Sequence, residues 1–108
     1  MSNLHLKSDP SFNDLQKYVD EMEKERGFID QSALQTFLLL TEEVGELAKI
    51  VRKYTGMRTD SSRTYEDDAA SEIADIFLVT TAVANRLGVD IESAIRAKEE
   101  KNKLREWL

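Results

Sequence analysis

The sequence predicts an all-α fold: a four-helix antiparallel bundle-like domain that assembles through its helices into an oligomer. Three observations support this class. The 108 residues include only four glycines and one proline, so few positions interrupt a helix. The alternation of β-branched and polar residues that marks a half-buried strand is almost absent. Apolar residues instead recur at spacings of three and four in four separate segments.

We expect one domain over residues 1–108, because this is an ordinary domain length and an apolar fraction of 41% supports a core. Residues 1–10 are expected to form a flexible polar tail without the apolar region of a signal peptide. The lack of cysteine excludes disulfides and thiolate metal ligands. No apolar run approaches the ~20 residues of a membrane span. The expected location is cytoplasmic, without a membrane partner.

The charge balance argues against nucleic acid as a partner. Fifteen basic residues face twenty-one acidic residues, which gives a net charge of −6. Binding to a phosphate backbone requires a basic face, which this composition does not favour. A small anionic ligand that arrives with metal ions remains compatible with this charge.

The first helix is expected over residues 12–26. Ser11 is placed to act as its N-cap, with Asp14 as the reciprocal partner of a capping box. Gly27 is placed to end it. Its apolar stripe consists of Leu15, Tyr18, Val19 and Met22.

The second helix is expected from about residue 31 to residue 55, with Asp30 or Ser32 as its cap and Gly56 at its end. Its first half is apolar almost all round and contains Leu34, Phe37, Leu38, Leu39 and Leu40. A helix of this kind is buried on more than one face. We therefore expect it at the centre of a bundle or at a subunit interface.

Residues 57–65 are polar and are expected to form a surface loop. The third helix is expected from residue 66 or 67 to Leu87, before Gly88. The fourth is expected to begin after the N-cap Asp90 and to continue to about Glu106. Helices joined by so short a turn are usually antiparallel neighbours.

Two pairs of acidic residues lie in the most apolar parts of the central helices. Glu43 and Glu46 follow the leucine run of the second helix, and Glu72 and Asp75 lie in the third. Residues three apart project to the same side of a helix, so both members of a pair can reach one point. Enclosed carboxylates are unfavourable unless a cation compensates them. If the two helices face one another, four oxygen donors converge, a set that suits magnesium, manganese or calcium.

The alternative is that these acids form a solvated helix face, since a single acidic pair is weak support for a site. Gly45 favours the metal-site interpretation slightly. A glycine inside a helix costs about 1 kcal/mol relative to alanine, so it suggests a close approach of another helix. A carboxylate-bridged di-iron site is excluded, because it needs histidines on its helices and the only histidine is His5.

The fourth helix carries a line of hydrogen-bond donors. Lys98, Asn102 and Arg105 continue the face that begins with Ile91 and Ile95. These donors could meet phosphate oxygens beside the acidic cluster. Alternatively, the basic residues simply complement the dipole at the C-terminal end of the helix.

The sequence resembles the MazG-like nucleoside triphosphate pyrophosphohydrolases, in the all-α NTP pyrophosphatase group. The resemblance covers roughly Leu34 to the C-terminus. Its four motifs are Glu-Glu-Val-Gly-Glu-Leu (42–47), Glu-Ile-Ala-Asp (72–75), Ala-Asn-Arg-Leu-Gly-Val-Asp (84–90) and Lys-Glu-Glu-Lys-Asn-Lys-Leu-Arg (98–105). Their order, spacing and helical placement are together more specific than any one of them.

The resemblance implies cleavage of a ribo- or deoxynucleoside triphosphate between the α- and β-phosphates, releasing a monophosphate and pyrophosphate. It implies Mg²⁺ as cofactor, with Mn²⁺ as a substitute, and a homodimer or homotetramer with a housekeeping role in the nucleotide pool. The implied metal ligands are Glu43, Glu46, Glu72 and Asp75. The implied residues near the phosphates or sugar are Lys98, Asn102 and Arg105.

Two further points stay open at this stage. Our hypothesis for the catalytic base, which accepts the proton of the attacking water, is Glu42 or Glu46. The main alternative to an enzyme is a catalytically silent helical regulator that binds nucleotide or metal. The intact acidic set favours the enzyme, since a silent relative would be free to lose a ligand.

Overall fold

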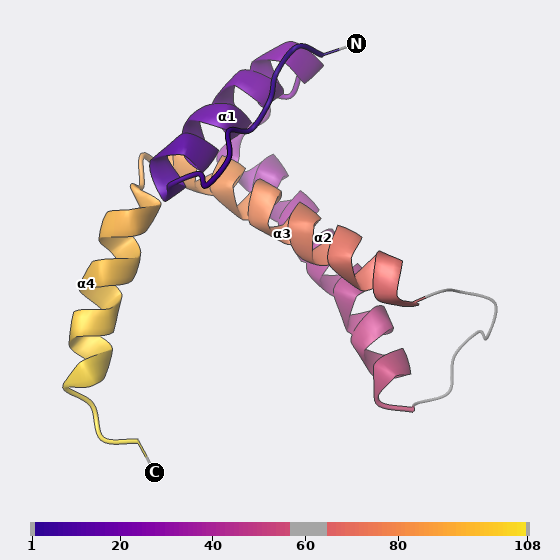
Figure 1. Ribbon diagram of the computed structural model, residues 1–108, viewed down its shortest axis with the longest axis vertical. Helices are drawn as coiled ribbons and strands as arrows, with labels where there is room; N and C mark the ends of the chain where they lie inside the picture. The colour runs from indigo at the N-terminus through magenta and orange to yellow at the C-terminus, as the bar shows by residue number, and fades with distance from the viewer. Residues whose placement is uncertain (1, 57–64, 108) are drawn as a thin grey trace.

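The computed structural model describes residues 2–56 and 65–107, which form four helices and no strand (Figure 1). The helices are α1 (Phe12–Arg26), α2 (Ala33–Tyr54), α3 (Tyr65–Leu87) and α4 (Ile91–Lys103). This confirms the predicted all-α class and its four helices. Of the loop expected over 57–65, residues 57–64 lie outside the described part of the chain. None of the four helices has the length and apolar character needed to cross a membrane.

Capping residues explain where α1 and α2 begin. The Ser11 hydroxyl accepts a hydrogen bond from the backbone of Asp14, whose carboxylate accepts one from the backbone of Ser11. Ser32 and Gln35 form the same reciprocal pair at the start of α2, so Ser32 rather than Asp30 is the cap. Gly27 ends α1 with a φ of 81°, a left-handed conformation that glycine adopts without strain.

The α2 and α3 helices lie side by side as an antiparallel pair, and α1 crosses this pair near the end of α3 (Figure 1). A small apolar cluster of Val19, Met22 and Ala82 joins α1 to α3. Leu4, from the N-terminal segment, packs against the same cluster. The core is therefore modest, and much apolar surface of α2 and α3 stays exposed.

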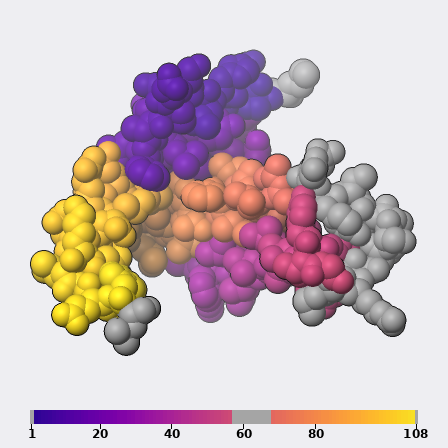
Figure 2. Space-filling view, turned by 60° about the horizontal axis from the view of Figure 1, so that its bottom comes forward, coloured from indigo at the N-terminus to yellow at the C-terminus, as the bar shows by residue number. Residues whose placement is uncertain are grey.

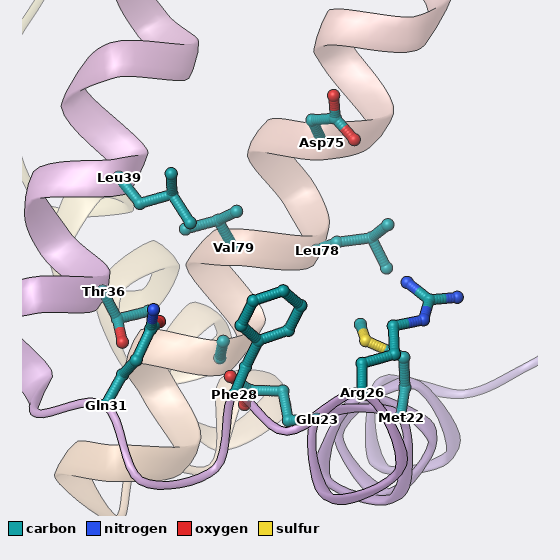
Figure 3. A pocket seen from close by; sticks show the side chains of 11 residues that line it. Met22, Glu23, Arg26, Phe28, Gln31, Thr36, Leu39, Asp75, Leu78 and Val79 are labelled. Carbon is teal, nitrogen blue, oxygen red and sulfur yellow. The ribbon is translucent and has the colours of Figure 1, made fainter.

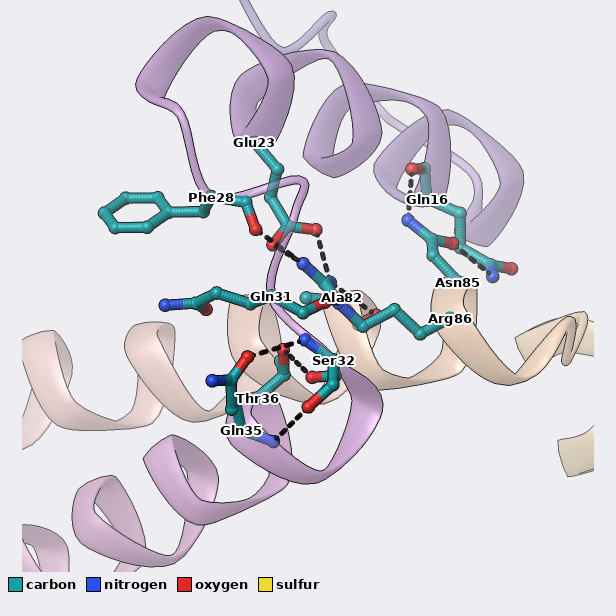
Figure 4. Close-up of polar contacts among 10 residues, drawn as sticks. All are labelled: Gln16, Glu23, Phe28, Gln31, Ser32, Gln35, Thr36, Ala82, Asn85 and Arg86. Atoms are coloured by element: carbon teal, nitrogen blue, oxygen red, sulfur yellow. Dashed lines mark hydrogen bonds and ion pairs between the residues drawn. The ribbon is translucent and has the colours of Figure 1, made fainter.

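A buried ion pair fixes the α1–α2 linker against α3 (Figure 4). The two terminal nitrogens of Arg86 each donate to one carboxylate oxygen of Glu23 at 2.8 Å. Arg86 also donates to the backbone carbonyls of Phe28 and Gln31, both at 2.8 Å, and to that of Ala82 at 3.1 Å. One guanidinium thus ties both helices and the linker together.

The short connection between α3 and α4 predicted that the two helices pack as antiparallel neighbours. This prediction is wrong. The α4 helix lies against α1 and has no buried residue. Figure 2 shows it (yellow) as a projection beyond the end of the α2–α3 pair. The reason is a polar clamp on the α3–α4 turn: the Gln16 amide donates to the carbonyl of Val89 at 2.9 Å and accepts from the Ile91 amide at 3.0 Å. Asn85 holds the same glutamine through two further hydrogen bonds.

We expect Gln16→Leu to accelerate amide hydrogen exchange at Ile91 several-fold to about tenfold, because this change removes the acceptor of that N–H. Exchange rates measured by NMR should be the same for the α2 amides in the variant and in the wild type. Lys17→Leu, at the exposed neighbouring position, is the matched control. Equal exchange at Ile91 in the wild type and in Gln16→Leu would show that the clamp does not set the direction of α4.

Candidate metal centre

Three carboxylates converge where α2 and α3 face each other. Glu43 of α2 and Glu72 and Asp75 of α3 each provide one oxygen, and these oxygens all lie within 4.8 Å of one another. All three residues are half-buried. The antiparallel pairing of α2 and α3 thus brings together acids from both predicted pairs.

The electrostatics of this cluster favour a bound cation. The pKa of Glu43 is raised to about 7, first by its hydrogen bond with Glu72, then by burial, and then by the negative charges of Glu72, Asp75 and Glu46. In addition, Oε2 of Glu72 is buried and has no hydrogen-bond partner among the described residues. A buried carboxylate oxygen without a donor is unfavourable, so this atom fits the role of a metal ligand.

The donor set fits a hard divalent cation. It contains carboxylate oxygens only, which magnesium, manganese and calcium prefer over nitrogen or sulfur. A divalent charge would also relieve the repulsion that raises the pKa of Glu43. The structure therefore provides three of the four acids that the sequence pointed to as a cation site.

The remaining predicted acids, Glu42 and Glu46, are not members of this cluster. The side chain of Glu46 is 45% exposed and pairs with Nζ of Lys49 at 3.4 Å. Glu42 is exposed on α2. Gly45 has no close helix neighbour within this chain, because a Cβ built there would meet nothing within 4 Å in the described structure. The close approach that its position suggested is therefore not made by another helix of the same chain.

The predicted donors of α4 are not brought to the acidic cluster within one chain. Lys98 is exposed on α4, which projects away from α2 and α3 (Figure 1). Arg105 is also exposed, but it lies beyond the C-cap Leu104, because α4 ends at Lys103 rather than at about Glu106 as expected. The Arg105 guanidinium lies 4.7 Å from the centre of the Trp107 ring. The Asn102 amide donates to Glu99 at 3.0 Å, while its Oδ1 is buried without a described partner.

A pocket of about 160 Å³ adjoins the cluster and shares Asp75 with it (Figure 3). The pocket extends from Asp75 to the α1–α2 linker, where Phe28 and Gln31 line it. Sequence reasoning missed these residues. Their spacing carries no motif, since the lining side chains come from three helices and the linker.

The raised pKa of Glu43 predicts a pH-dependent response to magnesium. Protonation of Glu43 contributes stability to the metal-free fold that is fully present below its ordinary pKa of 4.5 and is lost as pH rises through about 7. A divalent cation held by this cluster would require the deprotonated carboxylate, so we expect the affinity of the cluster for magnesium to rise over the same pH range. We expect magnesium to raise the melting temperature more at pH 8 than at pH 6.

Thermal unfolding with and without magnesium chloride at both pH values measures this effect. Glu43→Gln is the control. It removes the titrating group, so the magnesium-induced gain in melting temperature should no longer differ between pH 6 and pH 8. An equal gain at pH 6 and pH 8 in the wild type would contradict the prediction.

Comparisons with known proteins identify a family and two relatives of this chain. The chain matches the family model of the MazG nucleotide pyrophosphohydrolase domain over residues 31–106, a range that includes the acidic cluster and α4. The uncharacterized protein YpjD of Bacillus subtilis (strain 168) is 32% identical over 89 residues, which cover 81% of this chain and 78% of that protein. The uncharacterized protein YvdC of the same organism is 30% identical over 94 residues, which cover 82% and 89% respectively.

Proposed function

The chain belongs to the MazG nucleotide pyrophosphohydrolase family, and from this premise we propose that it cleaves ribo- or deoxynucleoside triphosphates between the α- and β-phosphates. The products are a nucleoside monophosphate and pyrophosphate, and the role is housekeeping of the nucleotide pool. The single observation that carries the proposal is the convergence of Glu43, Glu72 and Asp75 within 4.8 Å, inside the region that matches the family.

In this proposal the three clustered carboxylates hold Mg²⁺, for which Mn²⁺ can substitute. Glu46 becomes a further ligand when its exposed contact with Lys49 is released. When bound, magnesium supplies positive charge that neutralises the triphosphate and polarises the attacking water. The three carboxylates are half-buried, and their reduced contact with water strengthens their hold on a cation.

The attacking water also needs a proton acceptor. We assign this role to Glu42 or Glu46, because both belong to the same segment of α2 as Glu43 and neither is one of the three clustered acids. Near-normal single-turnover rates in both Glu42→Gln and Glu46→Gln would rule out this assignment.

Hydrolysis in ¹⁸O-labelled water tests which phosphorus the water attacks, and the identity of the products tests where the triphosphate is cleaved. Attack at the α-phosphorus places the label in the monophosphate, and attack at the β-phosphorus places it in pyrophosphate. We expect the label in the monophosphate. Release of a diphosphate and inorganic phosphate would contradict the proposed reaction altogether.

We further propose that the active protein is a homodimer or homotetramer. Leu34, Leu38 and Phe77 are 66%, 55% and 61% exposed on the α2–α3 pair, and apolar surface of this kind marks an interaction face. The Cα radius of gyration is 16.6 Å, whereas a compact domain of this size has about 13 Å. A second copy that covers α2 and α3 offers a way for the α4 donors of one chain to reach the acidic cluster of another.

Subunit complementation tests this shared site. We expect Asp75→Asn and Lys98→Ala to be inactive or nearly so when separate, and their mixture to regain activity after subunit exchange. For a dimer the recovery approaches roughly a quarter of the wild-type activity, because half of the dimers are mixed and each mixed dimer has one complete site. If the mixture is no more active than its two components, Lys98 does not contribute to the acidic cluster of a partner subunit.

A further inference from the structure

The pocket next to the acidic cluster has the form of a binding site for one flat ring. Its apolar lining includes Phe28 of the linker, Leu39 of α2, and Leu78 and Val79 of α3. In Figure 3 the Phe28 ring lies centrally, and Asp75 lies on α3 beyond it. Asp75 therefore connects an apolar chamber to the carboxylates that are proposed to hold the magnesium of the bound triphosphate.

The volume of the pocket indicates which group fits between its walls. A cavity of about 150 Å³ lined by aliphatic and aromatic side chains holds one benzene molecule. This pocket has a volume of about 160 Å³, so it matches a single six-membered ring. The fused second ring of a purine would have to extend beyond its walls.

The enclosed polar groups of the pocket point to one recognition residue, since the Arg26 side chain that also lines the pocket is exposed. The carboxylate of Glu23 is already paired with Arg86, and the hydroxyl of Thr36 donates to the carbonyl of Ser32 at 3.0 Å. The side-chain amide of half-buried Gln31, in contrast, makes no hydrogen bond in the described structure. Figure 3 shows this amide beside Thr36 at one side of the pocket. Apolar walls with a few convergent polar groups are typical of small-ligand sites.

We infer that this pocket binds the base of a pyrimidine nucleoside triphosphate, with Gln31 as the residue that forms hydrogen bonds with the polar edge of the base. The inference rests on the proposed function, since it directs the phosphates of the same molecule towards Asp75. An amide provides one acceptor and a donor group, so it can pair with the edge of cytosine and, after rotation, with that of uracil or thymine. The size of the pocket makes pyrimidine triphosphates the preferred substrate class, and Gln31 does not discriminate among cytosine, uracil and thymine.

The experiment compares two variants of the pocket with one control. Gln31→Leu removes the polar edge while keeping the size of the side chain. Val79→Phe fills the pocket. Val51→Phe makes the same change at a half-exposed position of α2 that does not line it. Each protein is checked for helical content and oligomeric state before use.

Two readouts are measured. The first is kcat/KM for CTP, dCTP, UTP, dTTP, ATP and GTP with magnesium. The second is the affinity of the non-cleavable α,β-imido analogues of dCTP and dATP by calorimetry. We expect the wild type to favour pyrimidines at least about tenfold in both. Gln31→Leu lowers this ratio, and Val79→Phe weakens the dCTP analogue at least about tenfold, while Val51→Phe matches the wild type.

The outcomes separate this inference from the proposed function. One outcome is that the wild type binds pyrimidine analogues selectively, loses this binding in Val79→Phe, and cleaves no nucleotide. That result would overturn the proposed reaction and support the pocket as a base-binding site. Cleavage that is equal for purines and pyrimidines and unchanged in both pocket variants would support the function and overturn the pocket. A Val79→Phe protein that alters oligomeric state but leaves analogue binding intact would show that a second copy fills the pocket, and would also overturn the inference.

Discussion

Asp75→Asn is expected to lower kcat/KM for nucleoside triphosphates on the order of a thousandfold. The change replaces a charged ligand oxygen with a neutral amide at a position that belongs both to the carboxylate cluster and to the adjoining pocket. It also removes one of the negative charges that crowd Glu43. The metal-free variant should therefore be at least as stable as the wild type, which separates loss of activity from loss of folding.

Steady-state kinetics combined with thermal unfolding check both parts of this expectation. Asp20→Asn is the matched control, because Asp20 lies on α1 in an exposed pair with Lys24 at 2.9 Å. We expect the control to retain wild-type activity. If Asp75→Asn kept more than about a tenth of wild-type kcat/KM, the carboxylate cluster would not be the catalytic centre.

Arg86→Leu is expected to lower the free energy of unfolding by about 3–5 kcal/mol. The substitution leaves the carboxylate of Glu23, which is only 5% exposed, without its cation. It also removes the donors to the carbonyls of Phe28 and Gln31, so the linker loses its attachment to α3. Small domains have total stabilities of about 5–15 kcal/mol, so a large part of the stability depends on this one side chain.

Urea denaturation measures the loss, and a double-mutant cycle identifies its cause. In Glu23→Leu/Arg86→Leu neither charge is buried alone, so we expect this protein to recover much of the stability that Arg86→Leu loses. Glu23→Gln provides a milder variant if Arg86→Leu does not fold. A loss below about 1 kcal/mol in Arg86→Leu would mean that the ion pair behaves like a solvated surface pair.

Local signals in the sequence were sufficient to predict the helices. Ser11 and Asp14 form the predicted capping box, and Gly27 ends α1 in the left-handed conformation. These features depend on residues three or four apart, so their geometry follows directly from helical spacing. The convergence of acids on α2 and α3 was also predictable, because it required only that two apolar helices pair through their enclosed acid-bearing segments.

The features that the sequence could not predict depend on contacts between distant residues. Gln16 sets the direction of α4 through hydrogen bonds to residues 69 to 75 positions away. Glu23 and Arg86 are ordinary charged residues in sequence, and only the crossing of α1 over α3 buries them as a pair. The same crossing forms the pocket beneath Phe28. No spacing rule within one helix encodes these contacts.

The acidic residues illustrate the same limit at a finer scale. Helical spacing placed Glu43 and Glu46 on one side of α2, yet only Glu43 joins the close cluster with Glu72 and Asp75. Glu46 turns outward to Lys49 instead. Side-chain rotamers and local ion pairs determine whether each carboxylate joins the cluster or points outward. Helical periodicity alone does not predict either of them.

Product analysis with a panel of ribo- and deoxynucleoside triphosphates tests the central claim most directly. The wild type, Glu46→Ala and Asp75→Ala are compared with magnesium and with a chelator. We predict monophosphate and pyrophosphate from the wild type, with both products lost on chelation and in both variants. If folded protein that binds magnesium turned over no nucleotide, the result would contradict the proposed reaction and favour a catalytically silent nucleotide-binding regulator.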